Sequence, residues 1–288
     1  MKSTFNPFRS SGKDKVCVPD NLPAAGSPQP TSIPPPAFTV LPTYKLDILL
    51  PPSTPLTIIE LFQSQGCSSC PPANANVLRL LGAQDTLSAA QRQTLNGTNT
   101  LVLTYDVTYW DYIGWPDTFG DARWDARQRE YAAAMGSRSV YTPQVIVNGT
   151  ASGVGARQSE LDALIREGAS APHANSVSVT ITSPSSPSPS STPTEIIISG
   201  PATTPALVHL ILYDPATHRV AIARGENAGR TLPHRNIVRD AVVLCAWDRG
   251  SARFALPEGV AAARARGWEA VVLVQRGRGG AVVGAARV

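Results

Sequence analysis

Residues 56–72 read LTIIELFQSQGCSSCPP, an apolar run that leads into two closely spaced cysteines and two prolines. The first seven residues are rich in branched apolar side chains, which is typical of a short buried β-strand. Proline has no backbone N–H and is tolerated only in the first turn of a helix. We therefore expect a strand at 56–62 and a regular helix that begins at or just after Cys70.

The Cys67-Ser68-Ser69-Cys70 motif predicts a dithiol/disulfide redox site. A CxxC pair alone also occurs in zinc sites and structural disulfides, but this pair directly follows a buried strand and opens a helix. A helix N-terminus presents unpaired N–H groups and the positive end of the helix dipole, and both favour a thiolate. We expect Cys67 to attack as the thiolate and Cys70, one helical turn later, to resolve the mixed disulfide.

The elements around the motif alternate between strand and helix. This alternation predicts an α/β fold with helices packed on the faces of a sheet, in the order β-α-β-α-β-β-α. The expected segments are strand 56–62, a helix from residue 70, strand 100–107, helix 121–135, strand 144–149, a short strand within 150–154, and helix 157–168.

The character of the sequence changes near Pro172, where we expect a domain boundary. Residues 1–43 are rich in Pro, Ser and Gly and are predicted to form a disordered tail. Residues 44–172 form the predicted CxxC domain. Residues 173–288 hold short β-branched runs that favour a mostly antiparallel, β-sandwich-like domain. Within it, the low-complexity segment 183–193 is expected to be a long loop.

A second motif, YTPQVIVNG at 141–149, leads into the third predicted strand. With it the chain resembles the thioredoxin superfamily, in which this strand begins with a cis-proline that faces the CxxC. The resemblance implies that Pro143 is cis and that the backbone of Thr142 pairs with a substrate segment.

The resemblance extends further along the chain, over roughly residues 56–288. SQGCSSCPPA, WDYIGWPD, YTPQVIVNG and RGENAGRTLPHRNIVRD are together similar to a family of thioredoxin-like proteins of unassigned function. In that family a CxxC domain is followed by a β domain.

The chain departs from thioredoxin at two places. Ser68-Ser69 replaces Gly-Pro between the cysteines, so thioredoxin's redox potential does not carry over. The buried acid that thioredoxin has six residues before its first cysteine is Leu61 here, and the acid nearby is Glu60. Glu60 is either a proton acceptor for Cys70 or a partly buried strand carboxylate with a local partner. Strand alternation places it on the opposite face from Leu61 unless a bulge intervenes.

Other polar and aromatic candidates follow the second strand, at the sheet edge where open α/β folds bind ligands. Tyr109, Trp110 and Trp115 either form a platform for an extended peptide or seal the loop as core residues. Asp106 is a candidate for orienting a group near the thiols. The polar segment 224–240 either docks the two domains or binds an anion or partner.

The bulk composition narrows the function classes. Four cysteines in 288 residues are too few for a disulfide scaffold, and we expect Cys245 to be an inert buried thiol and Cys17 to be free. A single CxxC and isolated histidines predict no zinc site. The net charge of +4 is carried largely by scattered arginines without a nucleic-acid motif, so no nucleic-acid partner is expected.

The sequence contains no apolar run of about 20 residues, so we expect no membrane span. It also shows no apolar core of a secretory signal near residue 1. The expected location is therefore cytoplasmic, with a mitochondrial one still open.

These features predict a thiol–disulfide oxidoreductase that acts through Cys67, Cys70, Thr142 and Pro143 on protein or small-molecule disulfides. No organic cofactor is expected, and electrons would come from a dithiol donor or glutathione. Two alternatives stay open. One is a partner-binding protein with a redox-switch disulfide, and the other is a metal-handling protein that uses the two thiolates.

Overall fold

The computed structural model describes residues 55–85, 99–172, 174, 176–182, 194–201, 205–248 and 250–288. The elements in these residues are β1 (Leu56–Gln63), α1 (Cys70–Asp85), β2 (Asn99–Asp106), the 3-10 helix η2 (Asp111–Ile113), α3 (Ala122–Ala134), β3 (Gln144–Val147), β4 (Ala151–Gly153), α4 (Gln158–Ala169), β5 (Ser178–Thr182), β6 (Glu195–Gly200), β7 (Ala206–Asp214), β8 (His218–Ala221), β9 (Thr231–His234), β10 (Ile237–Trp247), β11 (Gly250–Ala255), α5 (Gly259–Arg264), β12 (Glu269–Arg276) and β13 (Val282–Arg287). The tail predicted at 1–43 and the loop predicted at 183–193 lie outside the described residues.

The first part of the chain has the predicted α/β, thioredoxin-like fold. Its elements run β1-α1-β2-α3-β3-β4-α4, in the expected order. β1 is parallel to β2 and antiparallel to β3, which in turn pairs with β4 in an antiparallel ladder. α1 begins at Cys70, because the prolines at 71 and 72 fit only into a first helical turn.

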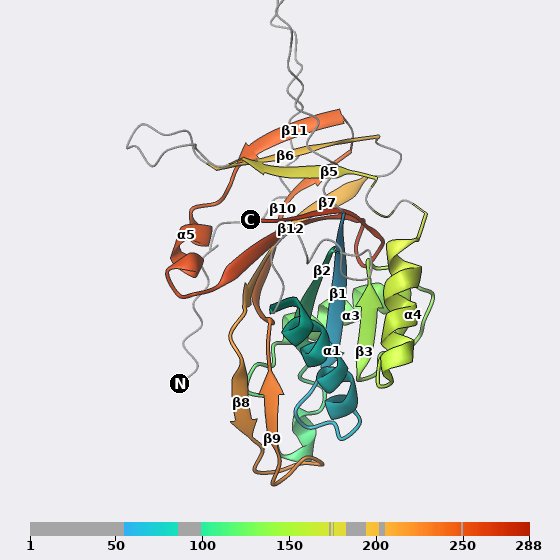
Figure 1. Ribbon diagram of the computed structural model, residues 1–288, viewed down its shortest axis with the longest axis vertical. Coiled ribbons are helices and arrows are strands. Elements are labelled where there is room, and N and C mark those ends of the chain that lie inside the picture. Colours follow the sequence, from blue (N-terminus) through green and yellow to red (C-terminus); the bar gives the residue numbers. More distant parts are fainter. Residues whose placement is uncertain are drawn as a thin grey trace, which may run out of the picture.

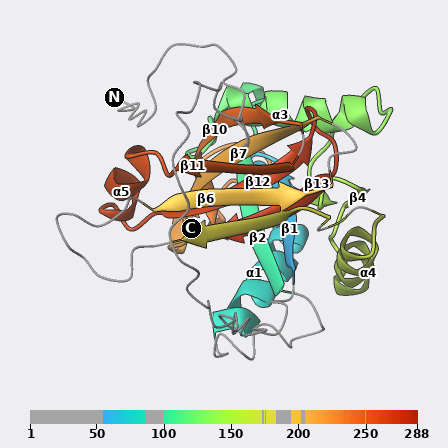
Figure 2. The same cartoon turned by 90° about the horizontal axis from the view of Figure 1, so that it is seen from above.

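The two faces of this sheet are covered by different helices. Successive side chains of a strand point to opposite faces. Ile59 and Leu61 of β1 therefore pack with α1 and α4, whereas Ile58 and Phe62 pack with α3. Figure 2 shows α3 on one side of the strands and both α1 and α4 on the other. The helix start that carries the cysteines thus lies on the face of Leu61.

The strands of the second part continue the same sheet. Its eight strands are ordered β13-β12-β7-β10-β2-β1-β3-β4, so strands from both sides of Pro172 are neighbours. The joint is at β2, where the backbone N–H of Thr104 donates to the Asn236 carbonyl oxygen at 2.9 Å. The Asn236 side chain donates to the Val102 carbonyl oxygen at 2.8 Å. The sheet is thus continuous across the predicted boundary, and the division into two domains stays a prediction.

The remaining strands form two smaller sheets. β11, β6 and β5 make an antiparallel sheet. This sheet packs over strands β7, β10 and β12 of the large sheet in a sandwich-like arrangement (Figure 1), and an apolar core lies between the two sheets. β8 and β9 form a hairpin that is tied to α1, because the Asn74 side chain donates to the Pro233 carbonyl oxygen at 2.6 Å. None of the described helices is long and apolar enough to cross a membrane.

Candidate redox site

The two cysteines lie at the junction between β1 and α1. The backbone N–H of Cys67 donates to the Ser64 carbonyl oxygen at 3.2 Å, and that of Cys70 donates to the Cys67 carbonyl oxygen at 3.3 Å. These turns carry the chain from the strand into the helix. Both side chains are free thiols and both are buried, Cys67 at 1% and Cys70 at 3% exposure.

The surroundings separate the acidities of the two thiols. A hydrogen bond from Cys70 does most to lower the pKa of Cys67, to about 5. Hydrogen bonds from Ser69 and Thr142 act in the same direction, against the opposing effect of burial. For Cys70, burial and its bond to Cys67 raise the pKa. At neutral pH the pair therefore consists of one thiolate, Cys67, and one thiol, Cys70, which is the arrangement that disulfide exchange requires.

The Thr142–Pro143 peptide bond is cis, as the resemblance implies. The Thr142 carbonyl oxygen faces the motif, because it lies 3.6 Å from the Cys67 sulfur and 3.2 Å from the Ser69 hydroxyl oxygen. The Trp110 indole N–H donates to the Thr142 side-chain oxygen at 2.7 Å. The structure thus places Thr142 next to Cys67, with Pro143 following it in the chain and Trp110 bonded to its side chain.

The other two aromatic candidates are held by hydrogen bonds of their own. The Tyr109 hydroxyl donates to Gln128 at 3.1 Å, and the Trp115 indole N–H donates to Gln65 at 2.9 Å. Both side chains are half-buried. Tyr112, which lies on η2 and was not among the candidates, is 81% exposed and stacks on Trp110. Tyr112 is therefore the exposed ring of this segment, and it stacks on the half-buried Trp110.

Glu60 lies on the opposite face of the sheet from α1, as uninterrupted strand alternation predicts. It is 1% exposed, and its carboxylate accepts from Arg127 Nε at 2.7 Å. The Tyr131 hydroxyl also donates to it. The carboxylate is thus occupied by partners on α3, which favours the reading of a buried strand carboxylate with local partners over a proton acceptor for Cys70.

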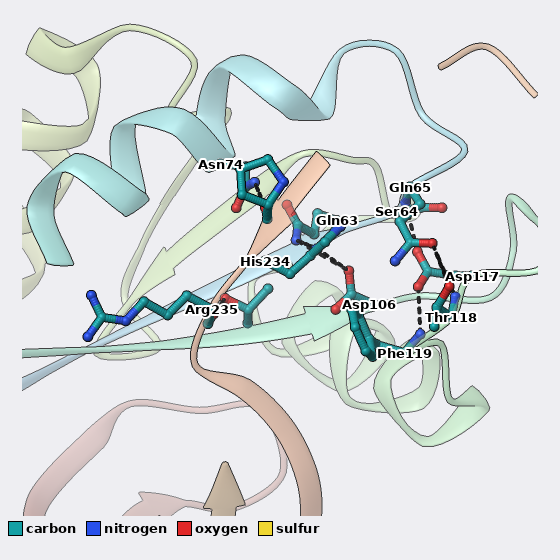
Figure 3. Close-up of polar contacts among 12 residues, drawn as sticks. Gln63, Ser64, Gln65, Asn74, Asp106, Asp117, Thr118, Phe119, His234 and Arg235 are labelled. Atoms are coloured by element: carbon teal, nitrogen blue, oxygen red, sulfur yellow. Dashed lines mark hydrogen bonds and ion pairs between the residues drawn. The ribbon is translucent and has the colours of Figure 1, made fainter. Parts of the chain in front are cut away.

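A different buried acid lies on the α1 face. The Gln63 side-chain amide donates to Asp106 Oδ1 at 3.3 Å and lies 3.0 Å from His234 Nδ1. Figure 3 shows these three side chains converging from β1, β2 and β9. Within the described part of the chain, Asp106 Oδ2 and His234 Nε2 have no hydrogen-bond partner. Burial and the nearby Asp117 raise the pKa of Asp106. Sequence reasoning named Asp106 as a candidate and His234 only as part of the polar segment 224–240, and it missed Gln63. The spacing of the three residues along the chain carries no signal.

The segment 224–230 contacts the CxxC loop directly. The Asn227 side chain is fully buried and donates to the carbonyl oxygens of Gln65 and Cys67 at 2.9 and 2.8 Å. The exposed Glu226 carboxylate accepts from the backbone N–H of Ser68 at 2.8 Å. These contacts agree with a docking role for the segment. The two side chains are functional candidates that sequence reasoning named only as part of a polar stretch.

One cysteine expectation is wrong. Cys245, expected to be an inert thiol, is disulfide-bonded. It lies on β10 at the apolar core between the sheets, and its apolar neighbours gave no sequence signal for a bond. Cys17, expected to be free, lies outside the described residues. No group of three or more His, Cys, Asp or Glu side chains in the described part of the chain is placed to hold a metal ion.

Comparisons with known proteins place this arrangement in a family. The family model described as "Protein of unknown function (DUF1223)" matches residues 58–275. The crystal structure of protein AGR_C_4864 from Agrobacterium tumefaciens is 28% identical, with a TM-score of 0.60 over 81% of this chain and 93% of that one. HBP35 of Porphyromonas gingivalis is 13% identical, with a TM-score of 0.48 over 82% and 75% of the respective chains. No curated protein matches. Since the family model covers most of the chain, including both cysteines, the protein belongs to the DUF1223 family.

Proposed function

We propose that this protein is a thiol–disulfide oxidoreductase that acts on protein or glutathione-type disulfides. The observation that carries the proposal is the pair of free thiols at the start of α1, one with its pKa lowered to about 5 and the other with its pKa raised. A purely structural cysteine pair has no need of such a separation, whereas perturbed pKa values cluster at functional sites.

The reaction has two exchange steps. In the first, the Cys67 thiolate attacks one sulfur of the substrate disulfide, a Cys67–substrate disulfide forms, and the other substrate sulfur leaves as a thiolate. In the second, Cys70 loses its proton to that leaving thiolate or to solvent and attacks Cys67. The Cys67–Cys70 disulfide forms and the remaining substrate sulfur leaves as a thiolate. The substrate gains two electrons, and a dithiol donor or glutathione returns two electrons to the pair.

The backbone beside the cis-proline would position the substrate. The Thr142 carbonyl oxygen is 3.6 Å from the attacking sulfur, so a peptide N–H that bonds to it places a neighbouring substrate sulfur within reach of Cys67. Extended peptides commonly bind in this way, by adding to an exposed backbone edge. The exposed Tyr112 ring, stacked on Trp110, supplies an apolar surface for residues that flank the disulfide.

The decisive experiment compares Cys67→Ser with Cys70→Ser. We expect Cys67→Ser to reduce turnover of glutathione disulfide, or of a disulfide-bonded protein such as insulin, to the background rate. We expect Cys70→Ser to accumulate mixed disulfides that mass spectrometry detects, with Cys67→Ser/Cys70→Ser as the matched control. Failure of both single variants to trap a mixed disulfide, together with unchanged turnover in Cys67→Ser, contradicts the proposal.

A second candidate function is a partner-binding protein in which the CxxC disulfide is a switch. The contacts of Glu226 and Asn227 with the CxxC loop favour it, because a change of loop conformation on oxidation would reach the segment 224–230. Partner binding that survives in Cys67→Ser supports this candidate. A reduction potential between about −270 and −120 mV supports the oxidoreductase, and one below about −300 mV supports a structural disulfide.

The location of the protein stays a prediction. The disulfide at Cys245 favours a compartment in which disulfides persist, because cytosolic thiols are usually kept reduced. Counting the alkylated cysteines of protein taken directly from cells, without added reductant, tests whether Cys245 is oxidised there.

A further inference from the structure

Ser69 lies between two acceptors that the proposed reaction uses. Its hydroxyl oxygen is 3.0 Å from the Cys67 sulfur and 3.2 Å from the Thr142 carbonyl oxygen. A serine hydroxyl carries a single hydrogen and can therefore serve only one of these acceptors at a time as a full donor. Which acceptor receives the hydrogen depends on the charge of the sulfur.

We propose that the Ser69 hydroxyl is a redox-dependent switch, which donates to the Cys67 sulfur in the dithiol form and to the Thr142 carbonyl oxygen in the disulfide form. This inference rests on the proposed function and adds a positioning residue to it. No bond other than the hydrogen bond changes when the hydroxyl turns.

In the dithiol form the thiolate is the stronger acceptor. Hydrogen bonds to an ionised partner are about twice as strong as those between neutral groups. The hydroxyl therefore turns toward Cys67, where it helps to lower the pKa of that thiol. The Thr142 carbonyl oxygen is then released from the hydroxyl and can accept from a substrate N–H.

In the disulfide form the order reverses. A neutral disulfide sulfur is a weak acceptor, so the hydroxyl turns to the Thr142 carbonyl oxygen. There it takes up one of the two lone pairs of the carbonyl oxygen and weakens the bond to the N–H of a bound peptide. The reduced protein thus offers the carbonyl to a disulfide substrate, and the oxidised protein withdraws it from the reduced product. Ser69 in this way couples the oxidation state of the pair to substrate release.

Ser68 provides a matched control. It neighbours Ser69, both serines are exposed, and truncation of either to alanine leaves no buried cavity. Its backbone N–H bonds to Glu226 Oε2 at 2.8 Å, and its side chain also bonds to Glu226. Ser68→Ala therefore removes a hydroxyl from the same loop without removing a donor to Cys67.

The first test is a pH titration of the thiolate absorbance in Ser69→Ala, Ser69→Thr and Ser68→Ala. We expect Ser69→Ala to raise the pKa of Cys67 by about one unit, the size typical of a hydrogen bond to a charged group. Ser69→Thr should titrate like the wild type, and so should Ser68→Ala. A tenfold loss of thiolate stability also makes the reduction potential more negative by about 30 mV. A Ser69→Ala titration that coincides with the wild type overturns the inference.

The second test follows the Thr142 carbonyl by its ¹³C chemical shift in the assigned NMR spectrum. Wild type and Ser69→Ala should differ at this carbonyl in the oxidised protein and coincide in the reduced protein. A difference of equal size in both states overturns the switch. Neither test requires turnover. If the wild-type protein shows no oxidoreductase turnover, that result refutes the proposed function alone. Unchanged titration in an active Ser69→Ala protein would refute this inference alone.

Discussion

Two buried carboxylates on opposite faces of the same sheet differ in how they are satisfied. Glu60, on the α3 face of β1, forms an ion pair with Arg127 and accepts from Tyr131. Asp106, on the α1 face of β2, is fully buried and lies 3.6 Å from the neutral His234, and among the described residues its Oδ2 has no hydrogen-bond partner. A buried polar group with all its hydrogen-bond partners stabilises one structure. A buried polar group that lacks a partner marks a place where a proton, water or ligand can bind. We therefore expect Glu60 to act in folding, and we expect Asp106 to be the carboxyl group of the two that exchanges protons or water more readily.

The network around Glu60 joins distant parts of the chain. Arg127 on α3 also lies 3.1 Å from the Tyr131 hydroxyl, and Gln275 on β12 donates to that hydroxyl at 3.0 Å. The Gln275 amide further donates to the Gly280 carbonyl oxygen at 2.8 Å. The network therefore connects β1, α3 and the strands of the second part, and it holds α3 against the large sheet.

The largest expected effect comes from breaking the α3-face pair. Arg127→Met leaves Glu60 buried without its counter-charge and should lower the free energy of unfolding by about 3–5 kcal/mol, measured by urea denaturation. The double variant Glu60→Met/Arg127→Met should recover much of this loss, because it removes both charges together. A loss in Arg127→Met below about 1 kcal/mol would show that the pair does not hold this face.

The next effect concerns His234 on the α1 face and depends on pH. Burial lowers the pKa of His234 to about 4, against about 6.5 in an unfolded chain. The unfolded state therefore binds the proton first, and stability falls as the pH drops from about 6.5 to 4, by about 3 kcal/mol at most. His234→Asn should flatten this part of the stability profile.

His209, in the other half of the sheet, provides the internal reference. Burial lowers the pKa of His209 to about 3, so protonation of His209 also lowers the free energy of unfolding as the pH falls into the acid range. That loss should remain in His234→Asn. An unaltered profile in His234→Asn would mean that His234 is not buried in its neutral form.

The effect expected at Asp106 has the opposite sign, and it sharpens the contrast with Glu60. Since burial raises the pKa of Asp106 above its unfolded value, the folded state binds the proton more tightly. The stability that the protonated Asp106 contributes to the folded state is therefore lost as the pH rises above about 4. Asp106→Asn should raise the free energy of unfolding at pH 7 relative to the wild type, because the buried amide needs no proton, and this gain should shrink as the pH falls toward 4.

Glu60→Gln is the matched carboxylate-to-amide control. Glu60→Gln should lower the free energy of unfolding at pH 7, in contrast to Asp106→Asn, because it deprives the buried Arg127 of its counter-charge. Equal changes in the two variants, measured in the same urea series, would remove the distinction between the two faces.

Much of the candidate site was predictable because it is local in the chain. Cys67 and Cys70 are three residues apart at the end of an apolar strand, and the prolines after them restrict where α1 begins. The cis peptide before Pro143 followed from resemblance, and the strand and helix order followed from the alternation of apolar runs. These features depend on neighbours in sequence, so short-range patterns contain the information.

What the sequence alone determined, then, is the cysteine pair, its place at a helix start and the order of elements in the first part. Only the tertiary structure decided which groups surround that pair. Gln63 and His234 are 171 positions apart, and Asn227 reaches Cys67 across 160 positions. Such contacts depend on β10 pairing with β2 in the large sheet, which brings the β8–β9 hairpin onto α1. Strand order between distant segments is set by packing of whole faces, and no local period in the sequence records it.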